Sequence, residues 1–245
     1  MLSMSKRRVR RVLGAPLLAA SLGLNLAVVG VASVPMAAQA LDLSALTQAD
    51  ATAGVKAALQ KGADAAVSSL GKSNGFLGNP EVKIPLPEAM QQARKLMKLM
   101  GKDKEFDALE TGMNRAAEVA VHDAKPLLAN AIKTMSVADA KSILSGGDDS
   151  VTKFFRDKTQ TDMFQKFLPI VTQYVNKLGL AKQYNSLAAQ AAKFGLVKEE
   201  DANIENYVTN KAMDGLYQMI AVEEKAIRAD PVGTGSAILK KVFAK

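Results

Sequence analysis

The sequence predicts an all-α protein: a multi-helix bundle of about eight to nine helices with a short extended Gly/Pro arm after the first helix. Three observations support this fold class. Apolar side chains recur at three- and four-residue spacing along most of the chain. Capping residues, glycines and prolines separate these runs where helices are expected to begin and end. The alternating prolines near residues 81–87 favour an extended backbone over a short length only.

The first forty residues have the pattern of a secretory signal peptide. A basic stretch, Lys6 to Arg11, precedes the uncharged residues 12–34, and Ala38-Gln39-Ala40 matches a small-x-small cleavage signal. We therefore expect residues 1–40 to be removed during export, which leaves no stable membrane insertion. The alternative is a retained anchor, since about 23 apolar residues can span a bilayer. Glycine, proline and asparagine within the stretch weaken that alternative.

Most of the net positive charge of the sequence lies in residues 1–40. The whole sequence has 32 basic and 24 acidic residues, but residues 1–40 hold five of the bases and no acid, which leaves 27 bases against 24 acids. A nearly balanced chain lacks the electrostatic footprint of a nucleic-acid-binding protein, so we expect no nucleic-acid partner. There is no cysteine, hence no disulfide. Residues 41–245 contain no linker and are expected to form a single domain.

Local signals place the first two helices. Thr47 and Asp50 resemble a capping box at the start of a helix over 48–70, and Gly71 suits its end. Turn-forming residues and the extended arm follow. Pro87 is well placed to begin a second helix that ends at Gly101. The expected buried stripe of this second helix is Met90, Ala93, Met97 and Met100.

A third helix is expected from about Lys104 to Val121, in a central position. One of its faces carries small residues, which lets a neighbouring helix approach closely: Ala108, Gly112 and Val119. The remaining helices are expected at about 125–135, 137–145 with a cap at Ser136, 150–158, 161–178 with a kink or break at Pro169, 180–194, 203–229 and 236–243.

Six segments along the chain together resemble a known family. They are Gly75 to Pro80, Lys83 to Pro87, Met113 to Glu118, Ala124 to Leu128, Gly146 to Asp149 and Glu223 to Pro231. Their order resembles the bacterial exported family catalogued as domain of unknown function 4197, over essentially the whole mature chain. The resemblance implies one domain in a bacterial periplasm. It implies no activity, cofactor or catalytic residue, because the family has none established.

Individual residues give few candidates for chemistry. His122 is the only histidine, and without a cysteine or a second histidine it is expected to be a surface or capping residue. The acidic loop 146–150 is interpreted as a helix stop followed by an acidic helix start, with a calcium site as the weaker alternative. Met97 and Met100 are interpreted as core residues rather than ligands of a cuprous ion. We expect no catalytic residue, no metal site and no cofactor.

Glu223 is the remaining candidate. On a helical wheel it falls within the apolar side of the last long helix, whereas Glu224 and Arg228 are expected to form an exposed i,i+4 pair. An inward carboxylate requires a partner. We expect either a buried ion pair, with Arg115 as the candidate base, or a cavity in which Glu223 binds a ligand or acts in acid–base chemistry.

These observations leave three functional hypotheses. The first is a non-catalytic interaction or structural protein of the periplasm with an unknown protein partner. The second is a carrier of a small apolar ligand in a cavity between the helices. The third is a carboxylate-dependent enzyme that uses Glu223.

Overall fold

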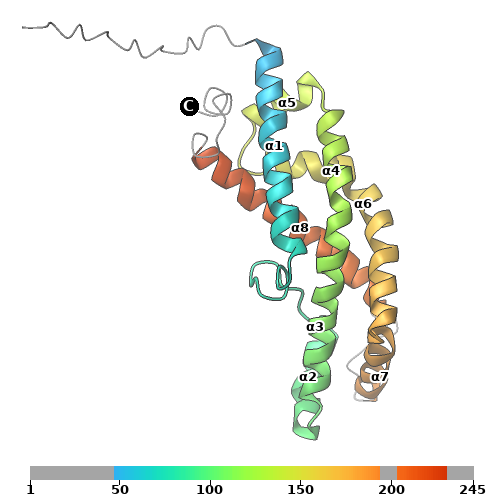
Figure 1. Cartoon of the computed structure of the whole chain (residues 1–245). Helices are drawn as coiled ribbons and strands as arrows, with labels where there is room; N and C mark the ends of the chain where they lie inside the picture. The colour runs from blue at the N-terminus through green and yellow to red at the C-terminus, as the bar shows by residue number, and fades with distance from the viewer. Residues whose placement is uncertain (1–46, 194–202, 231–245) are drawn as a thin grey trace, which may run out of the picture. The chain divides into compact units, whose positions relative to one another are not determined.

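The computed structural model describes residues 47–193 and 203–230, and within these ranges the chain is helical with no strand (Figure 1). The predicted all-α class is thereby confirmed. The expected signal peptide and the helix expected at 236–243 lie outside the described residues. The elements are α1 (Gln48–Gly71), α2 (Glu88–Met97), the 3-10 turn η2 (Lys98–Met100), α3 (Asp103–Ala120), η3 (Val121–Asp123), α4 (Ala124–Lys133), α5 (Val137–Ser145), α6 (Ser150–Lys177), α7 (Leu180–Ala192) and α8 (Ile204–Ala229).

The helix ends follow the predicted local chemistry. Thr47 and Asp50 form a capping box at the start of α1, and Ser136 and Asp139 form a second one at the start of α5. The hydrogen bond from the Ser136 backbone to its carboxylate lowers the pKa of Asp139. Gly101 has a φ of 74°, the left-handed conformation that ends the α2–η2 segment.

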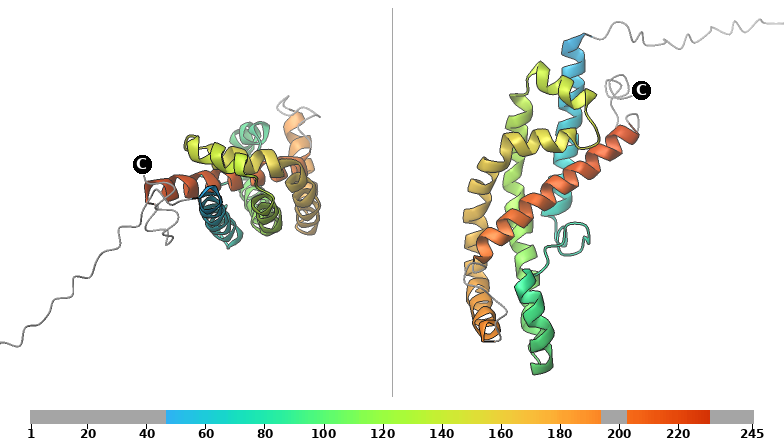
Figure 2. Two further views of the ribbon diagram at one scale, coloured as in Figure 1. Left: turned by 90° about the horizontal axis from the view of Figure 1, so that it is seen from above. Right: turned by 180° about the vertical axis from the view of Figure 1, so that it is seen from behind.

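One predicted boundary is wrong. We expected separate helices over 150–158 and 161–178, but α6 runs without interruption from Ser150 to Lys177. Pro169 lies inside this helix, where it removes one backbone donor and leaves the carbonyl of Gln165 without its helical partner. Both residues lie on the exposed side of the helix, so the freed carbonyl is not enclosed in the core, and the helix continues. Figure 2 shows instead that the ribbon of α6 changes direction in its first half.

The helices pack in two layers. In Figure 2, α1, the line formed by α3 and α4, and the second half of α6 lie side by side, and α8 crosses them together with α5 and the start of α6. α3 contacts α1, α2, α6, α7 and α8, which confirms its predicted central position. Most buried apolar side chains form one continuous core that includes Phe76, Ala117 and Leu216. No described helix is both long enough and apolar enough to span a bilayer.

Of the small residues expected to line a close helix contact, Gly112 does so. A Cβ atom on Gly112 would stand 2.5 Å from Cδ2 of Leu180 in α7. Ala108 and Val119 are exposed on the same helix and take no part in this contact.

The close approach at Gly112 gives a direct prediction. We expect Gly112→Val to lower the free energy of unfolding by about 1–3 kcal/mol, because the added methyl groups overlap the buried Leu180 side chain. Ala108→Val is the matched control and is expected to cost about 0.5 kcal/mol, the difference in helix propensity. Urea denaturation measures both. Equal losses would show that α7 moves away without cost.

The expected buried stripe of α2 is confirmed for Met90, Ala93 and Met97, which are all buried. It is wrong for Met100, whose exposed fraction is 62%. The hairpin of α2 and α3 extends beyond the other described helices at this end, so no described element covers the final turn (Figure 1).

Candidate functional site

The most buried carboxylate of α8 belongs to Glu224, whose side chain is 1% exposed. It lies against the first turn of α6. Its Oε1 accepts hydrogen bonds from the backbone N–H of Val151 at 3.1 Å and from Nη2 of Arg228 at 2.9 Å. Its Oε2 accepts the backbone N–H of Thr152 at 3.2 Å. Glu224 therefore caps the N-terminus of α6, where unpaired N–H groups and the helix dipole favour a negative charge.

Arg228 extends this contact to a third helix. Its Nη2 donates to Oγ of Ser150 at 2.7 Å and to the carbonyl oxygen of Ile143, near the end of α5, at 3.0 Å. The pair formed by Glu224 and Arg228 thus joins α5, α6 and α8. The i,i+4 pair expected from the sequence is present, but it is not exposed: Glu224 is buried and Arg228 is half-buried.

The expected positions of Glu223 and Glu224 are therefore reversed. Glu223 is half-buried next to α1, where its Cβ lies 3.5 Å from the position a Cβ would take on Gly62. The helical wheel located the buried side of α8 mainly from its alanine and aliphatic residues. It gave too little importance to Met213 and Tyr217, which are both buried. Glu224 follows Tyr217 by seven residues, or two helical turns, and so shares its face.

A second buried carboxylate lies on α3. The side chain of Glu118 is 6% exposed, and its Oε1 accepts the backbone N–H groups of Phe76 and Leu77, both at 3.2 Å. Its Oε2 accepts Nη1 of Arg115 at 2.6 Å. Arg115 also donates to Oδ1 of Asn74 at 2.8 Å. This pair fixes the segment between α1 and α2 onto α3.

The structure does not bring Arg115 and Glu223 together. Arg115 pairs with Glu118, three residues later on its own helix, because that carboxylate is already held at the buried edge of α3. The i,i+3 spacing of Arg115 and Glu118, with alanines between them, was the signal in the sequence that could have indicated this pair. The prediction therefore named the correct base, Arg115, but the wrong acid, Glu223.

The same segment is held at a second point by Asn114, which is fully buried. Its Oδ1 accepts the N–H of Ile84 at 2.8 Å, and its Nδ2 donates to the carbonyl of Ile84 at 2.9 Å. The side-chain amide therefore satisfies both backbone groups of one residue, as a neighbouring strand would. Most of residues 72–82 form turns, and residues 83–87 belong to no helix or strand.

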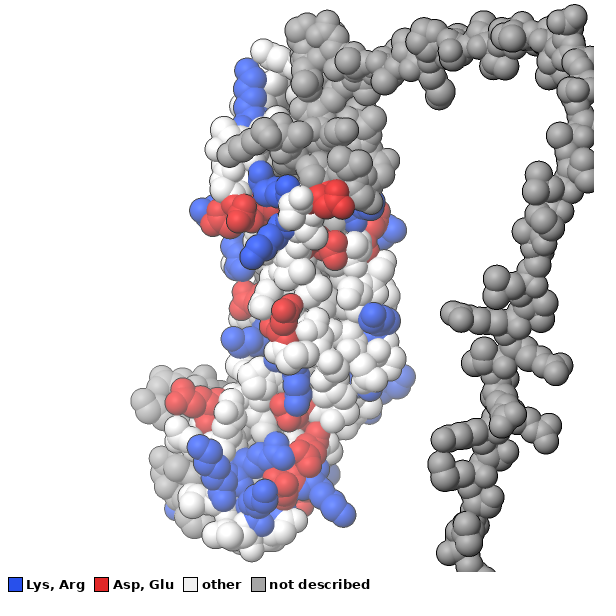
Figure 3. Space-filling view, turned by 90° about the vertical axis from the view of Figure 1, so that its left-hand side faces the viewer, with Lys and Arg blue, Asp and Glu red and all other residues white. Residues whose placement is uncertain are grey.

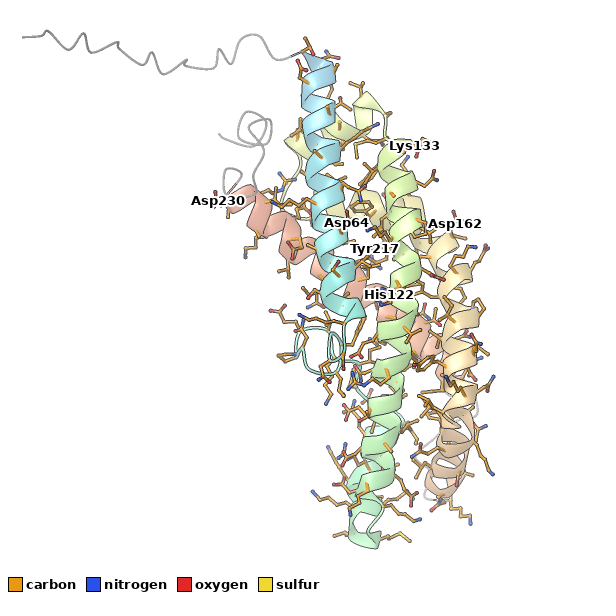
Figure 4. All side chains as sticks on the ribbon, in the orientation of Figure 1. Asp64, His122, Lys133, Asp162, Tyr217 and Asp230 are labelled. Carbon is orange, nitrogen blue, oxygen red and sulfur yellow. The ribbon has the colours of Figure 1, made fainter. Side chains whose placement is uncertain are left out.

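His122 is exposed, as predicted, and bonds to the end of α1 (Figure 4). Its Nε2 lies 3.0 Å from the carbonyl oxygen of Gly71. A carbonyl only accepts, so this nitrogen carries the proton. A Cβ atom on Gly71 would stand 2.4 Å from the imidazole, which explains the glycine at this position. Next to it lies an open hollow of about 350 Å³, lined in part by Arg115, Glu118 and Tyr174.

Tyr217 is a further buried ionisable group on α8 (Figure 4). Its hydroxyl lies 3.0 Å from Oγ1 of Thr159, and the guanidinium of Arg156 lies 4.6 Å from the ring centre. Burial raises the pKa of Tyr217, while the hydrogen bond with Thr159 acts in the opposite direction. The neutral phenol therefore serves as a packed hydrogen-bonding group of the core.

Two further hollows bear on ligands and metals. The first is apolar and lies between α1, α6 and α8, next to Glu224. Its volume is about 20 Å³, which is room for about one water molecule.

The second is a charged groove of about 520 Å³ along the loop between α5 and α6. There Asp149 pairs with Lys153 at 2.8 Å, and α5 ends and α6 begins around the loop, as predicted. No three acidic or histidine side chains of the described ranges are grouped to hold a metal ion.

Comparison with known proteins gives one match. The model of a family described as a protein of unknown function (DUF4197) matches residues 45–244. No curated protein and no solved structure matches the chain.

Proposed function

This chain belongs to the family of proteins of unknown function DUF4197, and we propose that it is a non-catalytic interaction protein exported to the periplasm. The observation that carries this proposal is the hydrogen bonding of the two most buried carboxylates among the described residues. Glu118 and Glu224 each use both oxygens to accept backbone N–H groups and an arginine of the same chain. They hold helices and a loop in place.

A carboxylate enzyme requires a different arrangement. A general acid or base must come within hydrogen-bond reach of the proton that it transfers to or from the substrate. The side chains of Glu118 and Glu224 are 6% and 1% exposed, and their oxygens are engaged by the groups that they bind. Glu223 is half-buried, forms no ion pair with a described residue and lines none of the three hollows described above.

An apolar-ligand carrier requires space. Sites for such ligands measure roughly 300–1,000 Å³ and are mostly apolar. The apolar hollow beside Glu224 leaves about 20 Å³, and the hollows of about 350 and 520 Å³ are open and lined in part by charged side chains. This supports the interaction hypothesis over the carrier hypothesis.

Native mass spectrometry of the protein purified from the periplasm tests the proposal. We expect the mass of the processed polypeptide, alone or in protein assemblies, without a bound small molecule. A stoichiometric small ligand that survives desalting would replace the proposal with the carrier hypothesis.

Export gives a separate prediction. We expect the protein isolated from cells to begin at Leu41, because Ala38-Gln39-Ala40 precedes it. N-terminal sequencing of the periplasmic fraction measures this. A chain that still carries residues 12–34 and sediments with membranes would support the retained anchor.

A further inference from the structure

The turn between α2 and α3 exposes an unusual amount of apolar surface. Leu96, Leu99 and Met100 are 49%, 90% and 62% exposed, and they are spaced i, i+3 and i+4, so they lie on one side of the turn. Leu99 and Met100 are the two most exposed large apolar residues of the described chain. We call residues 95–104 the α2–α3 tip.

Lysines surround these apolar side chains. Figure 3 shows basic side chains gathered, with several acids among them, at the end of the molecule formed by α2 and the start of α3. Lys95, Lys98 and Lys104 are exposed on the tip and form no ion pair with a described residue.

The acids of this region form ion pairs with other bases. Arg94 binds Asp103 at 2.8 Å and also pairs with Asp107, and Lys102 binds Glu105 at 2.6 Å. Hydrogen bonding to Arg94 lowers the pKa of Asp103, so this carboxylate stays ionised and paired. The three lysines of the tip form no ion pair with a described acid, and residues 94–107 together hold five basic residues against three acidic ones.

We propose that the α2–α3 tip binds an anionic lipid surface, with Leu99 and Met100 entering the headgroup boundary and the lysines contacting lipid phosphates. Apolar side chains flanked by lysines are the combination that holds a protein segment in a membrane interface. The contact is peripheral, consistent with the absence of a spanning helix among the described residues.

The shape of the tip favours lipid over other partners. Leu99 stands almost wholly in solvent at a convex turn, so no described wall encloses a small ligand there. A protein partner would need a pocket shaped to receive the turn, whereas fluid lipid adapts to it. The inference rests on the proposed function, because it names the partner of an interaction protein.

Vesicle sedimentation tests this inference. The full-length sequence is expressed and the protein is purified as the cell leaves it, so that all variants share the same N-terminus. We expect it to sediment with vesicles of equal parts phosphatidylglycerol and phosphatidylcholine, less with phosphatidylcholine alone, and less in high salt. The double variant Leu99→Ser, Met100→Ser should bind the anionic vesicles about tenfold more weakly, while Lys95→Gln, Lys98→Gln should lose most of the preference for anionic lipid.

The matched control is the double variant Val137→Ser, Val222→Ser. These residues are 43% and 41% exposed on α5 and α8, so the same kind of apolar surface is removed elsewhere. We expect it to bind like the unchanged protein. Circular dichroism spectra should agree among all variants, because every altered side chain is exposed.

Two results would overturn the inference: no binding of the unchanged protein to anionic vesicles, or equal binding by the tip variant. A photo-crosslinking residue at position 99 separates this failure from failure of the proposed function. A protein crosslinked there without vesicle binding would replace lipid with a protein partner and leave the interaction role standing. A retained small ligand in native mass spectrometry would overturn the interaction role itself.

Discussion

Replacing Glu224 by alanine is expected to lower the free energy of unfolding by roughly 3–5 kcal/mol, the loss observed when one partner of a buried ion pair is removed. The side chain is 1% exposed, so its partners gain little access to water when it is lost. Arg228, whose side chain is 17% exposed, then loses the Glu224 carboxylate, and the N–H groups of Val151 and Thr152 lose their acceptor. Urea denaturation followed by circular dichroism measures the effect.

Glu223→Ala is the matched control. It removes the same charge one position away, from a half-buried side chain that forms no ion pair with a described residue. We expect a change of about 0.5 kcal/mol or less, as for exposed charges. Equal losses for the two variants would contradict the assignment of the α6 cap to Glu224.

A double variant separates the ion pair from the helix cap. Glu224→Leu with Arg228→Leu removes both charges, and a buried ion pair replaced by apolar residues is often neutral. The N–H groups at the start of α6 still lack their acceptor in this variant. We therefore expect the double variant to regain part of the stability lost in Glu224→Ala. Full recovery would mean that the cap contributes nothing.

Sequence reasoning succeeded where the cause of a structure is local. The capping box at Thr47, the cap at Ser136 and the stop at Gly101 each depend on residues close in the sequence, and all appear as predicted. The continuity of α6 was missed for a different reason. Whether a helix continues through proline depends on where the freed carbonyl points, and this follows from packing.

The candidate site was predicted in part for the same reason. The sequence indicated that the end of α8 buries a carboxylate, but choosing between Glu223 and Glu224 required the direction from which α6 approaches. The i,i+4 pair of Glu224 and Arg228 was visible, and its burial was not. Arg115 was recognised as a partner for a buried acid, yet that acid lay three residues away, because a segment from elsewhere in the chain supplies N–H groups to Glu118.

Nothing in the sequence marked Asn114, although we expect it to be among the most sensitive residues. Asn114→Leu keeps nearly the same side-chain size but removes both hydrogen bonds to the backbone of Ile84, which is itself buried. A buried backbone group left unpaired costs about 1–3 kcal/mol. We therefore expect a loss of roughly 2–5 kcal/mol in the free energy of unfolding, measured by urea denaturation.

The loss should be accompanied by local opening of residues 72–87, because Ile84 and the Glu118 contacts hold this segment on α3. Limited trypsin digestion detects it, since Lys83 is partly exposed and next to Ile84. Asn130→Leu, at an exposed position on α4, is the control and should change neither stability nor cleavage by much. If Asn114→Leu is as stable as this control and Lys83 stays protected, the buried packing of Phe76 and Leu86 holds the segment without the amide.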